Sequence, residues 1–266
     1  MTKYMNNINS YSIILPTLNE SGHIKSLIFD ICKNFYKKKI LFEIIVVDDN
    51  SSDKTIDILK KIKLKNLKLI KRINKQKSLV DSLNDGINKA KYNNIIWMDA
   101  DYSHPPEYIS SFIKINKKKK LDGIVCSRFL KNSKRYYTKN NKNPSIIDIL
   151  SIFLNNLCRF FIFKDFTDYT SGYICIKSKL IKSKKLKGYY GDYFIRLITD
   201  YKIKNMQIQE IPFIENERAT GQSKTTKNKI DFIIKCLFYI IAVARGSLLK
   251  LSNFFFNKIK KKVFII

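Results

Sequence analysis

A short apolar segment that ends in two acids most constrains how this chain can fold. Residues 95–98 (IIWM) are apolar, residues 99–101 read DAD, and two prolines follow at positions 105 and 106. This pattern predicts a buried β-strand with two carboxylates at its carboxyl end and a helix soon afterwards. In open α/β sheets, ligands bind outside the carboxyl ends of the strands. Carboxylates one residue apart can converge on a hard divalent cation and on a diphosphate bound to it.

Apolar segments of strand type and helix type alternate along the rest of the chain. Strands are predicted at residues 11–15, 43–47, 67–72, 94–98, 123–129, 173–177 and 206–214. Helices are predicted at residues 23–36, 54–62, 78–91, from about 106, at 145–163 and at 192–201. Such alternation is typical of βαβ units, so we expect an α/β fold with a mainly parallel sheet flanked by helices. Residues 130–144 are basic and aperiodic, and form either a functional loop over the site or a disordered surface loop.

Acidic residues follow three of the predicted strands. Glu20 comes after the first strand, Asp48 and Asp49 end the second, and Asp99 and Asp101 end the fourth. Because the carboxyl ends of parallel strands share one edge of a sheet, these acids can line one cleft. Helix capping is the alternative explanation for a single acidic loop. It does not account for two acids at the end of each of two strands.

Four cations are candidates for a phosphate pocket beside these acids. They are Arg72, Arg128, Arg218 and Lys224. Arginine offers a planar fork to phosphate oxygens, whereas lysine offers a mobile point charge. Arg128 is the strongest candidate because it lies at a strand end beside the basic loop 130–144.

The charge balance points to an anionic partner. The 266 residues include 51 Lys+Arg against 22 Asp+Glu, for a formal net charge of +29. Part of the excess reflects a general preference for Lys, Asn and Ile, and the remainder suits a membrane surface, nucleic acid or a phosphorylated substrate. The five cysteines form no CxxC pair and are expected to be free thiols, and two histidines are too few for a zinc site.

The last 40 residues differ in character from the preceding sequence. The apolar run 230–243 is interrupted by Lys235 and followed by Arg245. A bilayer span needs about 20 apolar residues, so we interpret this run as too short. The pattern favours amphipathic helices in the interface of an anionic membrane. A helix packed on the protein's own core and a single true span are the alternatives. We therefore divide the chain into a domain at 1–227 and a basic, apolar, membrane-interface tail at 228–266.

Several motifs occur in an order that resembles a known family. They are PTLNE (16–20), VVDDNSSDKT (46–55), MDADYSHPP (98–106), CSRF (126–129), TSGYICIKS (170–178), GYYGDYF (188–194) and NERATGQSK (216–224). Together they resemble glycosyltransferase family 2, and within it the dolichol-phosphate (polyprenol-phosphate) mannosyltransferase group. The resemblance covers residues 11–227, and the tail is comparable only in character.

This resemblance implies a GT-A, Rossmann-like catalytic domain and an enzyme that transfers a hexose with inversion. The expected donor is a nucleotide-diphosphate sugar, with GDP-mannose favoured over UDP-glucose, and the expected cofactor is Mg²⁺ or Mn²⁺. The expected acceptor is a polyprenol or dolichyl phosphate at the cytosolic face of a membrane, the endoplasmic reticulum in a eukaryote. The tail would bind an anionic membrane surface peripherally, and a membrane-anchoring subunit is a further expected partner. No nucleic-acid partner is expected.

The resemblance also implies roles for individual residues. Pro16, Leu18, Glu20, Val47 and Asp49 would hold the nucleoside, and Asp48 would support them. Asp99, Ala100, Arg218 and Lys224 would complete the nucleotide-sugar site, with Gly221 and Ser223 shaping the last loop. Asp99, Asp101 and Ser103 would bind the metal, with Asp101 as the direct ligand and Ser103 as a weaker one. Arg128, Arg218 and Lys224 would hold the diphosphate and the acceptor phosphate. The catalytic residues would be Asp101, Arg128 and Asp192.

Two positions depart from the family pattern. Ser103 stands where the family often has a glutamine as a further metal ligand, and residues 72–78 lack the family's glycines.

Three questions stay open on the sequence alone. Asp192 is either a general base or the N-cap of the helix that follows it. The enzyme is alternatively a family 2 transferase that acts on a hydroxyl group of a protein, glycan or other lipid. A catalytically silent basic protein that binds membranes or nucleic acid is the second alternative. A protein that only binds nucleic acid would not need a cleft of acids, which repel phosphate.

Overall fold

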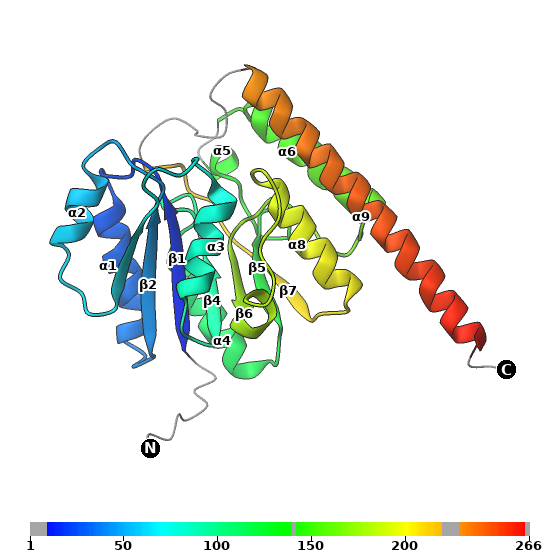
Figure 1. Cartoon of the computed structure of the whole chain (residues 1–266), viewed down its shortest axis with the longest axis horizontal. Coiled ribbons are helices and arrows are strands. Elements are labelled where there is room, and N and C mark those ends of the chain that lie inside the picture. The colour runs from blue at the N-terminus through cyan, green and yellow to red at the C-terminus, as the bar shows by residue number, and fades with distance from the viewer. Residues whose placement is uncertain (1–9, 140–141, 220–228, 264–266) are drawn as a thin grey trace.

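A seven-stranded sheet forms the centre of the protein in this computed structural model, which describes residues 10–139, 142–219 and 229–263 (Figure 1). The strands are β1 (Tyr11–Thr17), β2 (Phe42–Asp48), β3 (Leu67–Lys71), β4 (Asn94–Trp97), β5 (Gly123–Ser127), β6 (Ile174–Lys177) and β7 (Ile208–Pro212). The helices are α1 (Ile24–Tyr36), α2 (Thr55–Lys61), α3 (Leu79–Lys89), α4 (Tyr108–Lys118), α5 (Tyr136–Lys139), α6 (Ile146–Phe161), α7 (Ser178–Ile181), α8 (Asp192–Ile203) and α9 (Lys229–Val263).

The sheet is mostly parallel, which confirms the predicted fold class. Its strand order is β3-β2-β1-β4-β6-β5-β7, and only β6 runs antiparallel to its neighbours β4 and β5. β1 pairs with β2 along seven residues, from Tyr11 opposite Phe42 to Thr17 opposite Asp48. β1 also pairs in parallel with β4. The carboxyl ends of β1, β2 and β4 therefore lie together at one edge of the sheet, as expected from the acids that follow these strands.

Helices cover both faces of the sheet, and the alternation of side chains along β1 shows how. Ile13 and Leu15 belong to the core under α1 and α4, whereas Ile14 belongs to the core under α3 and α8. All three side chains are fully buried, because successive residues of a strand point to opposite faces. A strand buried on both faces reads as a continuous apolar run, which is the pattern that predicted it.

The structure shortens several predicted strands and adds two short helices, α5 and α7. The fifth strand ends at Ser127, because Arg128 turns out of the sheet and its backbone N–H donates a hydrogen bond to Asp168. The predicted strand 206–214 is reduced to Ile208–Pro212. Part of the basic loop forms α5, and Lys134 makes an isolated bridge to Ile214 beyond β7.

The tail is one helix, which corrects the prediction of several interfacial helices and of a run too short to span. α9 continues from Lys229 to Val263, past Arg245. Its part Lys229–Lys258 is long and apolar enough to cross a membrane by length and composition, and 22% of its most apolar window is buried. The predicted run 230–243 included Lys235 and ended before Arg245, whereas the helix continues past Arg245 to Val263.

α9 also packs on the domain along its first half. It lies against α6 and α8, and its far end extends away from the sheet (Figure 1). Ala242 and Val243 are buried in the core under α8. Gly246 allows the close approach, because a Cβ there would lie 2.8 Å from Ile162 and 3.1 Å from the Thr199 hydroxyl.

Gly86 on α3 provides a test of how closely the helix packs on the sheet. A Cβ at this position would lie 2.5 Å from a methyl carbon of Ile14 and 3.2 Å from one of Val47. We expect Gly86→Ala to lower the free energy of unfolding by about 1–2 kcal/mol, because overpacking outweighs the gain in helix propensity. Denaturant unfolding measures this change.

Asn88 on the exposed side of the same helix provides the control. Asn88→Ala also gains helix propensity, by somewhat less than Gly→Ala, makes no such clash and should not lower stability. Equal stability of the two variants would show that α3 can move away from β1 at no cost.

Candidate active site

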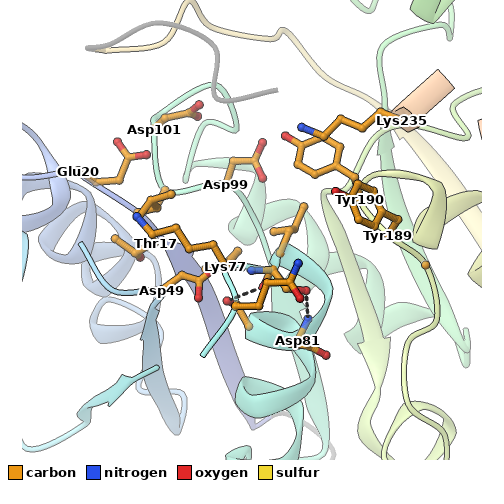
Figure 2. Close-up of a pocket in the computed structure, with 18 of the residues that line it drawn as sticks. Thr17, Glu20, Asp49, Lys77, Asp81, Asp99, Asp101, Tyr189, Tyr190 and Lys235 are labelled. Carbon is orange, nitrogen blue, oxygen red and sulfur yellow. Dashed lines mark hydrogen bonds between the residues drawn. The ribbon is translucent and has the colours of Figure 1, made fainter. Parts of the chain in front are cut away.

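A cleft of about 400 Å³ opens at the carboxyl ends of β1, β2 and β4 (Figure 2). Its walls also include the loop before α3, the loop before α8 and the start of α9. The lining residues are Pro16, Thr17, Leu18, Glu20, Asp49, Gln76, Lys77, Ser78, Leu79, Asp81, Ser82, Asp99, Ala100, Asp101, Gly188, Tyr189, Tyr190, Arg218, Asp231 and Lys235. The structure thus brings together the acids that the sequence placed at three separate strand ends.

The backbone turns sharply just beyond each of the three strand ends. Asn19, Asn50 and Tyr102 adopt positive φ angles of 55°, 62° and 65°. Asparagine tolerates this left-handed conformation, but it is uncommon for tyrosine. The Tyr102 hydroxyl donates a 2.6 Å hydrogen bond to Asp30 on α1, which anchors the turn. Such turns are concentrated at functional sites, where they direct side chains that a straight strand would bury.

The tips of β1 and β2 are tied to each other. The Ser52 amide donates to the Asn19 side chain at 2.8 Å, and the Asn19 amide donates to the Ser51 hydroxyl at 2.8 Å. Asp48 is fully buried and accepts hydrogen bonds from the Ser51 amide and hydroxyl. Asp48 and Val47 therefore support the site from below and do not line the cleft.

Asp49 is the β2 acid that faces the cleft. Its carboxylate accepts a 2.6 Å hydrogen bond from the Ser78 amide and is paired with the buried Arg72 guanidinium. Burial nevertheless raises the pKa of Asp49 above its ordinary value. Arg72 also contacts Asp85 at 3.2 Å, so it positions Asp49 and does not line the cleft as a phosphate ligand. On the neighbouring tip, Glu20 is paired with His23 at 2.9 Å.

Asp99 and Asp101 lie at the centre of the cleft edge. The Asp99 backbone N–H donates to His104 Nδ1 at 3.0 Å, and His104 stacks on the Tyr173 ring. Asp101 Oδ1 accepts from the Ser103 amide at 3.0 Å and from the Ser103 hydroxyl at 2.6 Å. These contacts fix the backbone at Asp99 and the carboxylate of Asp101. In this structure Ser103 acts as a donor to Asp101.

The two carboxylates have opposite pKa shifts. Burial raises the pKa of Asp99, and the charge of Asp101 adds to the rise. Burial also acts on Asp101, but the Arg218 guanidinium and the Ser103 hydrogen bonds lower the pKa of Asp101 below its ordinary value. Arg218 Nε lies 3.2 Å from Asp101 Oδ2. The pair therefore needs a positive charge beside it, which Arg218 supplies in this structure.

The donor set fits a hard divalent cation whose coordination a ligand completes. Carboxylate oxygens suit Mg²⁺ or Mn²⁺, and Mg²⁺ in phosphate sites is held by one or two carboxylates together with substrate phosphates. Among the described residues, no group of three or more His, Cys, Asp or Glu side chains is placed to hold a metal alone. The excess negative charge at Asp99 and Asp101 is what such an ion would neutralise.

Two of the predicted catalytic residues are engaged in structural contacts outside the lining of the cleft. Arg128 binds Asp168 through Nε at 2.8 Å and Nη2 at 2.9 Å, and binds Glu215 through Nη1 at 3.2 Å. Asp192 is fully buried at the start of α8. Its carboxylate accepts hydrogen bonds from the amides of Tyr189 and Tyr190 and from Arg196. It shapes the loop before α8, although the N-cap position of that helix is Gly191.

Of the other predicted residues, some line the cleft and some lie outside the residues that the structure describes. Pro16, Leu18 and Ala100 line the cleft as expected. Lys224 and its neighbours Gly221 and Ser223 lie outside the described residues.

Several lining residues were not predicted from the sequence, and three groups of them carry polar or aromatic side chains from outside the strand ends. They are Gln76, Lys77 and Ser78 before α3, Tyr189 and Tyr190 before α8, and Asp231 and Lys235 on α9. The paired tyrosines stood between two glycines in a quoted motif, which was a usable signal. Lys235 was noted only as an interruption of an apolar run. A lone charge in such a run is itself a sign of a specific contact.

Comparisons with known proteins agree with this geometry. The sequence model of Glycosyl transferase family 2 matches residues 12–188. A dolichol-phosphate mannosyltransferase of Pyrococcus furiosus is 28% identical over 217 residues, which is 80% of this chain and 58% of that protein. An uncharacterized protein of Methanocaldococcus jannaschii is 28% identical over 236 residues, covering 85% of this chain and 98% of that protein. The chain thus spans little more than half of the first of these relatives.

Two solved structures share the fold. Glucosyl-3-phosphoglycerate synthase of Mycobacterium tuberculosis, crystallised with Mn²⁺, UDP-glucose and phosphoglyceric acid, superposes with a TM-score of 0.65 at 14% identity. That match covers 90% of this chain and 80% of the other. TarS 1–349 of S. aureus, crystallised with UDP-GlcNAc, gives a TM-score of 0.60 at 17% identity and covers 92% and 71%. At these identities the likeness shows the fold alone.

The buried pair of Arg128 and Asp168 predicts a large effect on stability. Asp168 is fully buried, so Arg128→Gln would leave its carboxylate without the balancing guanidinium. We expect a loss of about 3–5 kcal/mol in the free energy of unfolding. Denaturant unfolding of the purified protein measures it.

Lys202→Gln is the matched control. Its partner Asp165 is 63% exposed, so removing this ion pair should cost no more than about 1 kcal/mol. An Arg128→Gln protein as stable as this control would show that Arg128 is not needed to hold Asp168.

Proposed function

This chain belongs to glycosyltransferase family 2, and we propose that it transfers a hexose, with inversion, from a nucleotide-diphosphate sugar to a polyprenyl phosphate. The main support for this proposal is the position of Asp99 and Asp101 in the cleft (Figure 2). Glu20 and Asp49 form one wall of the cleft, and Tyr189 and Tyr190 form the other. The family resemblance and the GT-A architecture seen in the sequence are both confirmed.

The donor would lie along the cleft. The nucleoside would contact Pro16, Leu18 and Glu20 with Asp49, and the diphosphate would lie beside Asp99 and Asp101. Mg²⁺ or Mn²⁺, when bound, would supply Lewis-acid stabilisation of the leaving diphosphate. Arg218 contacts Asp101 and lines the same cleft, so it could also stabilise the negative charge that develops on the leaving diphosphate. Fixed cations around a developing negative charge account for much of the rate in such sites.

The chemistry of a phosphate acceptor matches the side chains that are present. A phosphate oxygen of the acceptor would attack the anomeric carbon, and the bond from that carbon to the donor diphosphate would break. The electron pair would leave with the nucleoside diphosphate. A phosphate monoester has a second pKa of about 6, so the attacking oxygen carries no proton to remove at neutral pH. This supports a phosphate over a hydroxyl, since Asp192 already accepts hydrogen bonds from Tyr189, Tyr190 and Arg196.

Exposed apolar side chains on α6 and α9 support a membrane-bound acceptor. The two helices lie side by side (Figure 1). Their exposed large apolar residues are Ile146, Ile147, Ile149, Leu150, Phe153, Phe160 and Phe161 on α6, and Ile230, Ile233, Leu237, Ile240, Ile241, Leu248, Leu251, Phe254, Phe255 and Phe256 on α9. Such a patch marks a surface that another apolar phase covers. We propose the cytosolic face of a membrane, with the tail 228–266 as the main contact.

Mannose is the favoured sugar because the P. furiosus relative is a dolichol-phosphate mannosyltransferase. Guanosine is the favoured base because the motifs of this chain resemble the group expected to use GDP-mannose. UDP-glucose is the second candidate, because the M. tuberculosis structure of this fold contains it. A transferase acting on a hydroxyl acceptor is the alternative function. A thermal-shift series of nucleotide-diphosphate sugars with Mn²⁺ identifies the donor, because specific binding stabilises the folded state.

Transfer itself is tested with radiolabelled donors and purified polyprenyl phosphate. We expect label in a lipid that mild acid hydrolyses, and loss of the product when EDTA removes divalent metal. Asp101→Asn should lower the rate at least about 100-fold, because it removes a carboxylate from the diphosphate side of the cleft. Scintillation counting of the extracted lipid measures both effects.

The outcomes separate the candidate functions. Label that enters only protein or glycan would favour a hydroxyl acceptor. A protein that binds no nucleotide sugar in the presence of any divalent metal would contradict the proposed enzyme.

Membrane association is tested on the far end of α9, which avoids the cleft. Replacing Phe254, Phe255 and Phe256 by serine removes side chains that are 62%, 59% and 66% exposed. We expect the triple variant to lose most of its flotation with anionic liposomes, because apolar burial drives interfacial binding. Donor binding, followed by thermal shift, should be unchanged.

The control replaces three exposed apolar residues elsewhere, Phe29, Leu41 and Ile73, with serine. This control protein should float like the parent. Equal flotation of both variants would rule out a specific contact of α9 with lipid.

A further inference from the structure

Lys235 is a buried cation that α9 carries into the catalytic cleft. The residue is 8% exposed and lines the cleft together with Asp231. Its Nζ lies 2.7 Å from Asp231 Oδ2 and 4.4 Å from the centre of the Tyr190 ring. Lysine is rarely buried unless it is paired, and here a carboxylate and an aromatic face hold the ammonium group. A helix of the apolar tail thus contributes a positioned charge to the site.

The position of Lys235 relates it to the acceptor end of the cleft. Figure 2 shows Lys235 and Tyr190 on the wall opposite Glu20 and Asp49, with Asp99 between the two walls. If the nucleoside contacts Glu20 and Asp49, and the diphosphate lies beside Asp99, then Lys235 faces the sugar and whatever receives it.

The excess of acids in the cleft suggests why a lysine is placed there. Among the described lining residues there are six acids, namely Glu20, Asp49, Asp81, Asp99, Asp101 and Asp231, and three cations, namely Lys77, Arg218 and Lys235. Arg218 is paired with Asp101, and Lys77 comes from the loop before α3. Lys235 is therefore the cation that the described part of α9 adds to an acidic cleft. An anionic acceptor could not approach these acids without such a charge.

The same helix connects the cleft to the apolar patch. Ile233 and Leu237, two residues on either side of Lys235, are 57% and 53% exposed. Phe238 stacks on Tyr189 with ring centres 4.7 Å apart, which holds this turn of α9 against the cleft wall. Residues two positions apart on a helix are about 200° apart around its axis, so Ile233 and Leu237 face away from the cleft that Lys235 lines. A lipid on the exposed side of α9 would therefore reach Lys235 by bending its phosphate end around the helix into the cleft.

We propose that Lys235 binds the phosphate group of the lipid acceptor, with Asp231 and Tyr190 orienting its ammonium group. This inference rests on the proposed transfer to a polyprenyl phosphate. A lysine ammonium is a mobile point charge with three donors, so it can stay near Asp231 and still bind a phosphate oxygen. The flexible stem lets it follow the phosphate as the attacking oxygen approaches the sugar.

The test measures the KM for the acceptor and the KM for the donor separately, in variants of the full-length protein. Lys235→Gln keeps a polar side chain of similar reach without the charge. With a short-chain isoprenyl monophosphate as acceptor, we expect the acceptor KM to rise about tenfold or more, as expected for a lost charge-assisted contact. The donor KM should change less than about twofold. Lys235→Arg should restore most of the acceptor affinity.

Two further variants separate binding from structural effects. Lys250→Gln, on the same helix but beside the Phe163 ring, should leave both KM values unchanged. Asp231→Asn combined with Lys235→Gln also removes the carboxylate that contacts the Lys235 ammonium group in the parent protein. The raised acceptor KM should persist in this double variant. Recovery of the acceptor KM in the double variant would show that repulsion by Asp231, and not loss of a phosphate contact, caused the effect.

The remaining outcomes distinguish this inference from the proposed function. An unchanged acceptor KM in Lys235→Gln, with normal transfer by the parent protein, would overturn the role of Lys235 alone. A rise in the donor KM instead would assign Lys235 to the donor diphosphate and overturn the proposal as stated. If the parent protein neither binds nor glycosylates the isoprenyl phosphate but does glycosylate the matching isoprenol, both the phosphate acceptor and the role of Lys235 are wrong.

Discussion

The mutual repulsion of carboxylates at one edge of the sheet is the constraint on which the site depends. Parallel strands deliver Asp49, Asp99 and Asp101 to the same cleft, where burial raises the pKa of Asp49 and Asp99. Two of these acids are held by defined partners: Asp49 by the Ser78 amide and Arg72, and Asp101 by Ser103 and Arg218. An edge so rich in negative charge suits a ligand that brings its own cation.

The positive charges of the chain are not concentrated at the cleft. Most of the excess charge lies away from the cleft, and the buried arginines serve to fix acids in place. Arg72 holds Asp49, and Arg128 holds Asp168 and Glu215. A strongly basic sequence can thus still present an acidic cleft, since fold and not composition decides which charges meet.

The sequence predicted the parts of the structure that depend on local pattern. Continuous apolar runs identified β1, β2 and β4, and the acids that follow them indicated the cleft, because strand ends and turns are encoded within a few residues. The partners of Arg128 could not be predicted in this way, since Asp168 and Glu215 are 40 and 87 positions away. Lys235 was missed for a related reason. Its role depends on how α9 packs against the loop before α8, which no local pattern records.

The packing of α9 has a consequence for where the protein can be divided. Gly191 leaves room for Tyr239, because a Cβ at Gly191 would lie 2.1 Å from the tyrosine hydroxyl. Ala242 and Val243 belong to the core, and Gly246 lies against Thr199. A shortened chain that ends near residue 227 would expose this core and lose a wall of the cleft. The part of α9 as far as Gly246 is therefore a packed part of the fold, and the protein could be shortened only beyond that residue without opening this core.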